Sequence, residues 1–260
     1  MIKFTLITVT YNAETTLGRT LLSVAEQTYP HIEHILIDGA SKDRTVEIAK
    51  NYPHLAKVVS EPDRGLYDAM NKGLRLATGD YVCFLNAGDK LHGADTLAKI
   101  SLSLTLPKRE GTMSEPSPFG GDGGGLNLPG VLYGHTNIVD DEGNFLHPRR
   151  LSPPEQLTWK SFKQGMLVCH QAFYARRDLC PEYDTTFRFS ADFDWCIRVM
   201  KQTDNLVHLP FTVADYLQEG MTTRNHRASL IERFRLMCRH YGVLPTLAQH
   251  LWFIIRAIIK

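Results

Sequence analysis

The most informative short stretch of the chain is an apolar run that ends in a polar turn. Residues Tyr81–Leu85 have the composition of a buried strand, and the turn Asn86–Asp89 follows directly. Open α/β sheets bind ligands just beyond the carboxyl ends of their strands. A lone Asp in such a turn suits a hard divalent cation that also grips a diphosphate. A helix cap is the plainer explanation of any single turn of this kind.

Three further polar clusters stand at the ends of strand-like runs. They are Thr8–Asn12, Asp38 and Glu61–Gly65. The carboxyl ends of neighbouring parallel strands share one edge of a sheet, so the four clusters would converge on one crevice. A cap or a turn explains each cluster singly, but four in register within residues 8–89 indicate one site.

Alternating strand-like and helix-like patterns position these clusters. Apolar runs at Phe4–Thr10, Ile35–Ile37, Val58–Val59 and Tyr81–Leu85 alternate with segments whose apolar residues recur at helical spacing. This repetition predicts an α/β protein with a mainly parallel, Rossmann-like sheet flanked by helices on both faces. Asn12 is expected to cap the first helix.

The composition changes after a predicted helix at residues 94–106. Residues 107–130 contain seven Gly and four Pro, which predicts a flexible loop. It is either a tolerated surface insertion or a lid over the site. Beyond it, the patterns predict a hairpin over Val131–His147, a strand near Gln171–Tyr174 and a helix over Ala191–Gln202.

Composition excludes several classes of protein. Lys and Arg number 29 against 28 Asp and Glu, so the charge balance argues against a nucleic-acid binder driven by bulk charge. Five scattered cysteines without a C-x-x-C pair indicate reduced thiols in a cytosolic protein rather than disulfides or zinc. The sequence patterns predict neither a signal peptide nor a membrane-spanning helix. A dinucleotide oxidoreductase is excluded because no G-x-G-x-x-G follows the first strand.

Four runs of sequence together resemble family 2 glycosyltransferases, which have the GT-A fold. They are V-T-Y-N, I-D-G-A-S-K-D-R-T, E-P-D-R-G-L-Y-D-A-M-N-K-G and A-T-G-D-Y-V-C-F-L-N-A-G-D, within residues 3–100. A weaker match continues through His170–Tyr174 and Ala191–Arg198. The chain looks most like the bacterial subgroup that builds capsule and exopolysaccharide repeat units. The resemblance implies a GT-A catalytic domain over residues 1–222.

The resemblance also implies how a nucleotide-sugar donor would bind. Asp38 would accept a hydrogen bond from a base N–H, which suits a uracil or guanine ring. Gly65 would permit close approach of the backbone to the nucleoside. The implied donor-binding residues are Thr8, Thr10, Asn12, Asp38, Asp63, Gly65, Lys72 and Asn86.

Asp89 matches the last residue of the family's D-x-D-like element and would hold Mg²⁺ or Mn²⁺ against the donor diphosphate. Two positions depart from the pattern of many relatives. Asn86 stands in place of an Asp, so the ion would rely more on phosphate oxygens and water. Met70 stands in place of an Arg, which makes Lys72 the candidate for a phosphate contact.

Asp192 matches the family's catalytic base. Inverting transfer needs a carboxylate that takes the acceptor hydroxyl's proton as its oxygen attacks the anomeric carbon. Ala191 stands where the family normally has Glu, and Asp194 is the alternative base. A non-catalytic acidic first turn of a helix also explains the pair. His170 matches a position near the acceptor, with a hydrogen-bonded structural histidine as the alternative.

The chain ends in a basic, amphipathic, helical segment over residues 223–260. Seven Lys and Arg side chains occur there against one Glu. In the last helix a wide apolar face that includes Trp252 adjoins a narrow cationic ridge, which suits a helix lying in a membrane interface. Docking onto the domain or onto a partner subunit explains it equally well. The prediction is a cytoplasmic protein that binds the anionic inner face of the plasma membrane.

The predicted function is therefore a metal-dependent, inverting glycosyltransferase of the hexosyltransferase type in surface polysaccharide synthesis. Its donor would be a UDP- or GDP-sugar and its acceptor a glycan or a lipid-linked molecule. The alternative is a non-catalytic GT-A-like module that binds nucleotide or membrane. Ala191, Asn86 and Met70 are the departures that favour this alternative.

Overall fold

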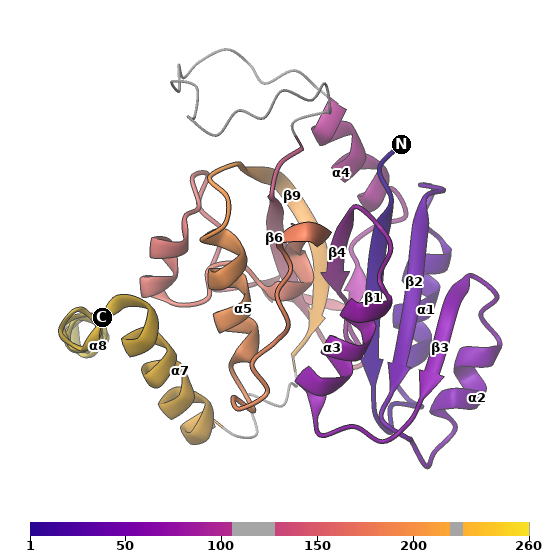
Figure 1. The fold of residues 1–260 in the computed structure, drawn as a ribbon, viewed down its shortest axis with the longest axis horizontal. Coiled ribbons are helices and arrows are strands. Elements are labelled where there is room, and N and C mark those ends of the chain that lie inside the picture. The colour runs from indigo at the N-terminus through magenta and orange to yellow at the C-terminus, as the bar shows by residue number, and fades with distance from the viewer. Residues whose placement is uncertain (106–127, 219–225, 260) are drawn as a thin grey trace.

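The computed structural model describes residues 1–105, 128–218 and 226–259. Its centre is a nine-stranded sheet in the order β3-β2-β1-β4-β8-β6-β9-β5, with β7 paired to β6. Helices lie on both faces of this sheet (Figure 1). Nearly all of the loop predicted over 107–130 lies outside the described residues.

The first half of the sheet is the parallel unit that the sequence predicts. β1 pairs in parallel with β2 and β4, and β2 pairs in parallel with β3. Thr10 is in register with Asp38, and Asp38 with Ser60, so the carboxyl ends of these strands share one edge. The elements are β1 (Phe4–Thr10), α1 (Leu17–Ala25), β2 (Ile32–Asp38), α2 (Thr45–Lys50), β3 (Leu55–Ser60), α3 (Leu66–Leu76) and β4 (Tyr81–Phe84).

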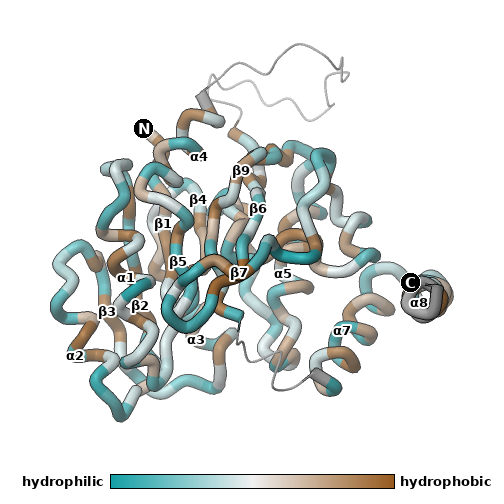
Figure 2. The backbone as a smooth tube through the Cα atoms, turned by 180° about the vertical axis from the view of Figure 1, so that it is seen from behind, coloured by the Kyte–Doolittle hydropathy of each residue, from teal (hydrophilic) through white to brown (hydrophobic). Residues whose placement is uncertain are grey.

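The second half of the sheet is mixed, which the sequence patterns do not indicate. The strands are β5 (Lys90–Leu91), β6 (Val131–Val139), β7 (Phe145–Pro148), β8 (Phe173–Arg176) and β9 (Leu206–Leu217). β8 runs antiparallel to both β4 and β6, whereas β6 and β9 are parallel. The β6–β7 pairing confirms the predicted hairpin. β5 and β7 face the viewer in Figure 2, which shows the side opposite that of Figure 1.

The helical segments between β4 and β9 are α4 (Thr96–Thr105), η1 (Trp159–Gln164), η2 (His170–Ala172), η3 (Arg177–Leu179) and α5 (Ala191–Met200).

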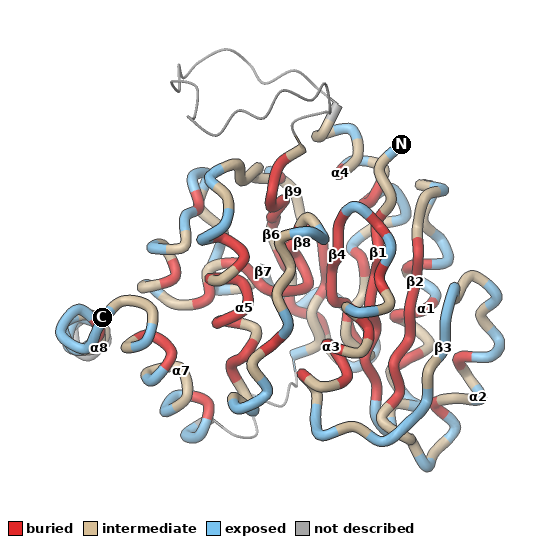
Figure 3. The backbone as a smooth tube through the Cα atoms, in the orientation of Figure 1, coloured by how far each residue is buried: buried red, intermediate tan, exposed pale blue. Residues whose placement is uncertain are grey.

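Side chains of β1 alternate between two hydrophobic cores. Ile7 and Val9 pack in the core that holds α3 and α5, whereas Phe4 and Leu6 pack in the core that holds α4. A strand buried on both faces shows this period of two. Figure 3 shows buried positions concentrated in the central strands.

Two helices at the C-terminal end lie on the α5 side of the molecule, away from β1–β3, and the second of them lies beyond the first (Figure 1). They are α7 (His226–Tyr241) and α8 (Val243–Ile259). Leu236 and Met237 of α7 are buried in the core that holds α5, and α8 packs against α7 and η1. Within the described ranges no helix is long and apolar enough to cross a membrane. The predicted boundary at residues 222/223 falls outside the described residues and stays a prediction.

Candidate active site

A cleft of about 930 Å³ gathers polar side chains from both halves of the sheet. It lies beyond the carboxyl ends of β1 and β4, where α/β sheets bind ligands. Asp89 and Asp192 both line it, so the residues predicted to hold a metal and to act as the base share one cavity. Its polar lining includes Thr10, Asn12, Arg19, Tyr67, Asn86, Asp89, Arg149, His170, Gln171, Asp192 and Arg233.

Asp89 is almost fully buried and is held by two groups from the second half of the chain. The backbone N–H of Leu217 donates to Oδ1 at 3.0 Å, and Gln171 Nε2 donates to Oδ2 at 2.6 Å. Burial raises the pKa of Asp89 to about 6, and these hydrogen bonds lower it only in part. A cation placed beside the carboxylate would favour its charged form. Asp89 is therefore suited to exchange a proton for a cation near neutral pH.

Asn86, on the same turn, carries a buried oxygen without a partner. Its Oδ1 accepts no hydrogen bond from any residue that the structure describes, whereas Nδ2 lies 3.2 Å from His170 Nε2. An orphaned acceptor near a carboxylate fits the oxygen ligands that Mg²⁺ prefers. The described part of the chain has no group of three or more His, Cys, Asp or Glu side chains that could hold a metal. The residues present therefore fit a cation held jointly with diphosphate and water.

Asp192 lies in the first turn of α5, and three neighbours orient its carboxylate. The Tyr67 hydroxyl donates to Oδ1 at 3.2 Å, and the backbone N–H of Phe193 donates to the same atom at 2.9 Å. His170 Nδ1 lies 3.4 Å from Oδ2. Because the amide of Asn86 donates to His170 Nε2, the ring proton resides on Nδ1 and points at Asp192. One imidazole therefore connects the Asn86 end of the cleft to the Asp192 end.

Electrostatics keep Asp192 ionised at neutral pH. Burial raises its pKa, but the hydrogen bond from His170 and the positive charge of Arg233 bring the pKa below the ordinary value. An ionised carboxylate can take up a proton, as a general base must. Burial and the charge of Asp192 in turn raise the pKa of Tyr67 well above its usual value, so Tyr67 remains a donor.

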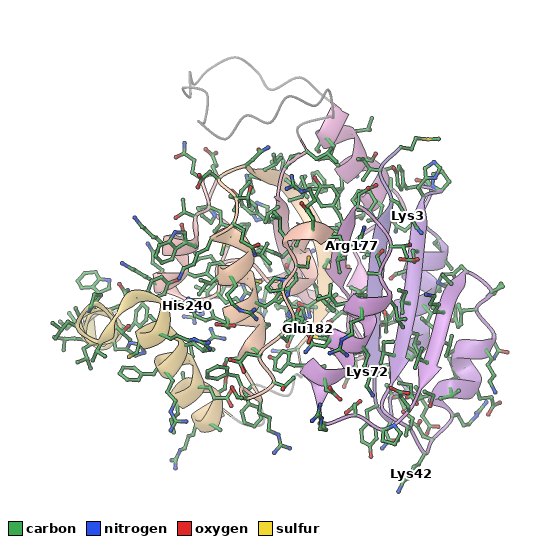
Figure 4. All side chains as sticks on the ribbon, viewed as in Figure 1. Lys3, Lys42, Lys72, Arg177, Glu182 and His240 are labelled. Atoms are coloured by element: carbon green, nitrogen blue, oxygen red, sulfur yellow. The ribbon has the colours of Figure 1, made fainter. Side chains whose placement is uncertain are left out.

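Asp194, the alternative base, is bound to other side chains. It is fully buried, with Oδ1 2.7 Å from His240 Nε2 and Oδ2 2.6 Å from Arg198 Nε. His240 lies on α7 (Figure 4), so this pair joins α7 to α5. Asp194 is not among the residues that line the cleft within the described chain. The geometry therefore favours Asp192 over Asp194 as the base.

Thr10, the last residue of β1, and Asn12, just after it, are predicted donor-binding residues that line the cleft directly. Thr10 is buried, and its Oγ1 has no partner among the described residues. Asn12 adopts a left-handed φ of 48°, which Asn tolerates better than most residues, and its Oδ1 accepts from the Lys42 backbone N–H at 2.9 Å. Thr16 occupies the cap position of α1. The prediction that Asn12 caps this helix is therefore wrong, because its side chain bonds to the loop after β2 instead.

Asp38 and Thr8 are fully buried and bonded within the sheet. Asp38 Oδ2 accepts from Ser60 Oγ at 2.6 Å and from the Ser41 backbone N–H at 2.9 Å, while the Ser41 hydroxyl binds Oδ1. Thr8 Oγ1 lies 2.9 Å from His34 Nε2. Neither Asp38 nor Thr8 is part of the cleft lining formed by the described residues. Their contacts with a nucleotide stay predictions.

Asp63, Gly65 and Lys72 lie on the segment from β3 into α3. Asp63 Oδ1 accepts from the Gly65 backbone N–H at 2.8 Å, and a Cβ on Gly39 would lie only 2.4 Å from Asp63 Oδ2. Gly65 has a φ of 119°, which glycine adopts at low cost. Lys72 (Figure 4) pairs with Glu61 at 2.9 Å. In the described chain none of the three predicted residues lines the cleft.

Comparison with known proteins assigns the family. The model of the family described as "Glycosyl transferase family 2" matches residues 5–101. A PGL/p-HBAD biosynthesis glycosyltransferase of Mycobacterium tuberculosis is 34% identical over 225 residues, covering 84% of this chain and 77% of that protein. The chain belongs to glycosyl transferase family 2. The amylovoran biosynthesis glycosyltransferase AmsB of Erwinia amylovora is 28% identical over 228 residues, covering 83% of this chain and 69% of AmsB.

Solved structures confirm the GT-A fold expected of family 2. S. aureus TarS 1-349 in complex with UDP-GlcNAc has a TM-score of 0.66 and 18% identity, covering 91% of this chain and 64% of the TarS fragment. This chain thus spans less than two thirds of that fragment. The mannosyltransferase PcManGT from Pyrobaculum calidifontis, in complex with GDP-Man and Mn²⁺, has a TM-score of 0.60 and 18% identity. The matched region covers 95% of this chain and 74% of PcManGT.

Several cleft residues of this family 2 chain have no role in the sequence interpretation. Tyr67 and Gln171 lie inside the motifs that carry the resemblance. Their positions close to Gly65 and next to His170 are the sequence signal that could have identified them as cleft residues. Arg233 belongs to the basic C-terminal segment, and no local pattern shows that its helix reaches the cleft. The basic residues Arg19 and Arg149 also line the cleft.

Proposed function

We propose that this chain is an inverting glycosyltransferase that moves a sugar from a UDP- or GDP-linked donor to an acceptor hydroxyl. One observation carries the proposal. The ionised Asp192 and the buried Asp89 line a single cleft, and His170 connects Asp192 to Asn86 beside Asp89. In this proposal Asp192 marks the acceptor end of the cleft and Asp89 the leaving-group end, as attack opposite a departing diphosphate requires.

In the proposed reaction Asp192 takes the proton of the acceptor hydroxyl while the hydroxyl oxygen bonds to the anomeric carbon. The bond from that carbon to the diphosphate oxygen breaks, and the nucleoside diphosphate leaves from the opposite face, so the configuration inverts. Tyr67 and His170 hold the two carboxylate oxygens of Asp192 in place. A positioned general base contributes about 10²- to 10⁴-fold to such a rate.

The residues of the turn after β4 would hold Mg²⁺ or Mn²⁺, with Asp89 and the free Oδ1 of Asn86 as protein ligands. A bound cation supplies positive charge to the leaving diphosphate. The PcManGT complex, which contains GDP-Man and Mn²⁺, supports this assignment by analogy of fold. The TarS and PcManGT complexes contain a uridine and a guanosine nucleotide, so both nucleotides are candidates.

The acceptor is proposed to be a glycan or lipid-linked molecule of surface polysaccharide synthesis. Relatives named for amylovoran and for PGL/p-HBAD biosynthesis support this class. The place of the reaction is proposed to be the cytoplasmic face of the membrane. Exposed Leu244, Leu251 and Trp252 on α8 adjoin a segment rich in Lys and Arg. Each cation near an anionic lipid surface adds ~1 kcal/mol of binding.

Calorimetry with UDP and GDP, with and without Mn²⁺, tests the proposed activity, followed by a screen of nucleotide-sugar donors for hydrolysis. Metal-dependent binding with slow donor hydrolysis is the expected result. Ala191, which replaces the usual Glu, instead favours a module that binds nucleotide without catalysis. Binding without hydrolysis of any donor would establish that second candidate.

Co-sedimentation with lipid vesicles tests the proposed membrane contact. Removal of residues 243–260 should release the protein from vesicles that contain anionic lipid. Purely zwitterionic vesicles serve as the control, because electrostatic attraction is absent from them. Equal co-sedimentation of the full-length and shortened chains with anionic vesicles would reject the membrane role and leave the proposed reaction intact.

A further inference from the structure

Arg233 differs from Arg19 and Arg149, the other arginines of the cleft, in the hydrogen bonding of its guanidinium. Arg19 Nη1 donates to the Asp140 carbonyl at 3.1 Å, and Arg149 Nη2 donates to the Met166 carbonyl at 2.7 Å. Arg233 forms no hydrogen bond or ion pair with any residue in the described ranges, although it lines the cleft. Five N–H donors in a planar fork are therefore available to a ligand.

A firmly anchored helix holds Arg233 at the cleft wall. The preceding residue, Glu232, accepts three backbone N–H bonds from residues 188–190, at 2.9, 2.7 and 3.2 Å. Further along α7, Leu236 is fully buried in the core that holds α5. Residues 188–190 lead directly into α5, where Asp192 lies. The same contacts therefore fix the positions of Arg233 and Asp192 relative to each other.

Arg233 belongs to the base end of the cleft. Its Cζ lies 5.1 Å from the centre of the Phe193 ring, and Phe193 is the residue next to Asp192. Its charge acts on the Asp192 carboxylate, which it helps to keep ionised. An arginine that rests on an aromatic face with its edge free is well suited to grip a phosphate with two hydrogen bonds. The acceptor must enter at this end, because its hydroxyl has to reach Asp192.

We propose that Arg233 binds a phosphate group carried by the acceptor, close to the hydroxyl that receives the sugar. The proposal rests on the proposed function and narrows the acceptor to a phosphorylated class, either an isoprenoid-linked diphosphate or a glycan with phosphate in its chain. Arg233 thereby selects and orients the acceptor without touching the reacting atoms. The nearby α7 residue Arg235 is exposed and is not among the cleft-lining residues of the described chain, so it provides a matched control.

Calorimetry on the full-length protein saturated with its nucleotide and Mn²⁺ tests the proposal, because the donor diphosphate site is then filled. The probes are geranyl diphosphate and glycerol 3-phosphate. Arg233→Gln should weaken probe binding at least tenfold, Arg233→Lys should recover part of it, and Arg235→Gln should behave as the wild type. A preference for geranyl diphosphate assigns the phosphate to a lipid carrier, and equal binding of the two probes assigns it to a glycan.

Nucleotide affinity and the thermal midpoint of each variant distinguish the possible failures. Arg233→Gln should leave both unchanged within about twofold and 2 °C, since Arg233 is only partly buried and rests on the face of the Phe193 ring without a hydrogen bond to any described residue. Nucleotide binding weakened tenfold would place Arg233 on the donor diphosphate and overturn the proposal. Equal probe binding by the wild type and Arg233→Gln, or no probe binding by the wild type, would also overturn the proposal. If nucleotide binding were intact in either case, the proposed reaction would still stand.

Discussion

Two groups of polar residues around the site differ in whether their side chains already have hydrogen-bond partners. In the parallel half, Asp38, Thr8 and Lys72 are already bonded to neighbouring side chains. At the turn after β4 and on α7, Asn86 Oδ1 and the Arg233 guanidinium have no hydrogen-bond or ion-pair partner in the described chain. Buried polar groups are normally satisfied, so those left free are the ones that a ligand can complete. The bonded residues thus build the frame, and the residues with unpartnered polar groups, Thr10 of β1 among them, are proposed to meet the substrate.

The two acids of α5 show the same division at the scale of one helical turn, and they give the largest expected effect. Asp192→Asn removes the proposed base and should lower sugar transfer about 10³-fold. Nucleotide affinity should stay the same, because Asp192 stands at the acceptor end. Donor turnover and calorimetry on the same preparation measure both quantities.

Asp194→Asn is the matched variant for that comparison. It weakens the bond to His240, which joins α7 to α5, and the bond to Arg198 within α5, which should cost about 2 kcal/mol of unfolding free energy. Activity measured below the unfolding transition should fall less than tenfold. If Asp194→Asn abolished turnover while Asp192→Asn kept it, the roles of the two acids would be reversed.

The pH dependence of nucleotide binding tests the proposed role of Asp89 as a metal ligand. Burial raises its pKa to about 6, so below that pH a cation has to displace a proton. Relative to Asp89→Asn, the Mn²⁺-dependent affinity of the wild type for nucleotide should therefore fall by a further factor of about ten per pH unit below 6 and level off above it. Titrations at pH 5, 6, 7 and 8 measure this. Asp89→Asn is the control, because only the titration of the nucleotide's own phosphate, near pH 6, persists in it.

His170 links the two ends of the cleft, so its removal should affect catalysis more than binding. The hydrogen bond from His170 lowers the pKa of Asp192, and His170→Phe should raise that pKa. The acid limb of the kcat profile would then move to higher pH, because the base becomes protonated sooner as the pH falls. The profile is measured at saturating donor and Mn²⁺. An unmoved acid limb with reduced kcat would mean that His170 only shapes the cleft.

A pair of threonines in β1 gives the smallest expected difference. Thr8→Val leaves the buried Nε2 of His34 without a partner and should cost about 1–2 kcal/mol of stability with unchanged nucleotide affinity. Thr10→Val removes a hydroxyl that already lacks an internal partner, so stability should hold while nucleotide affinity falls a few-fold. Urea unfolding and calorimetry separate the two effects. If the two variants had the same stability and the same nucleotide affinity, the distinction between frame and ligand-binding positions would be contradicted.

Much of the parallel half is predictable because its signals are local. Short apolar runs, followed by polar turns, mark β1 to β4 and the edge where they end. The antiparallel strands are less predictable. β8 inserts between β4 and β6, and its pairing of Tyr81 with Arg176 joins residues far apart in the sequence. No local pattern encodes such a pairing, yet it brings His170 to Asn86.

The sequence alone does not decide whether Asp192 or Asp194 faces the cleft. Residues two apart on a helix point about 200° away from each other, so only one of the pair can face the cleft. Which one does so depends on the rotation of α5 against its neighbours. The contacts of Glu232 and His240 on α7 set that rotation. Those contacts cross more than forty residues of chain, and the positive charge of the C-terminal segment gives no hint of them.

A crystal structure of the protein with Mn²⁺ and whichever of UDP and GDP binds tests the central claim most directly. The anomalous signal of Mn²⁺ should lie in the cleft beside Asp89 and Asn86 Oδ1, with the terminal phosphate directed toward the side where Asp192 faces it across a sugar-sized space. A nucleotide bound outside this cleft, or an Asp192 carboxylate on the same side of the anomeric position as the diphosphate, would contradict the proposed inverting mechanism.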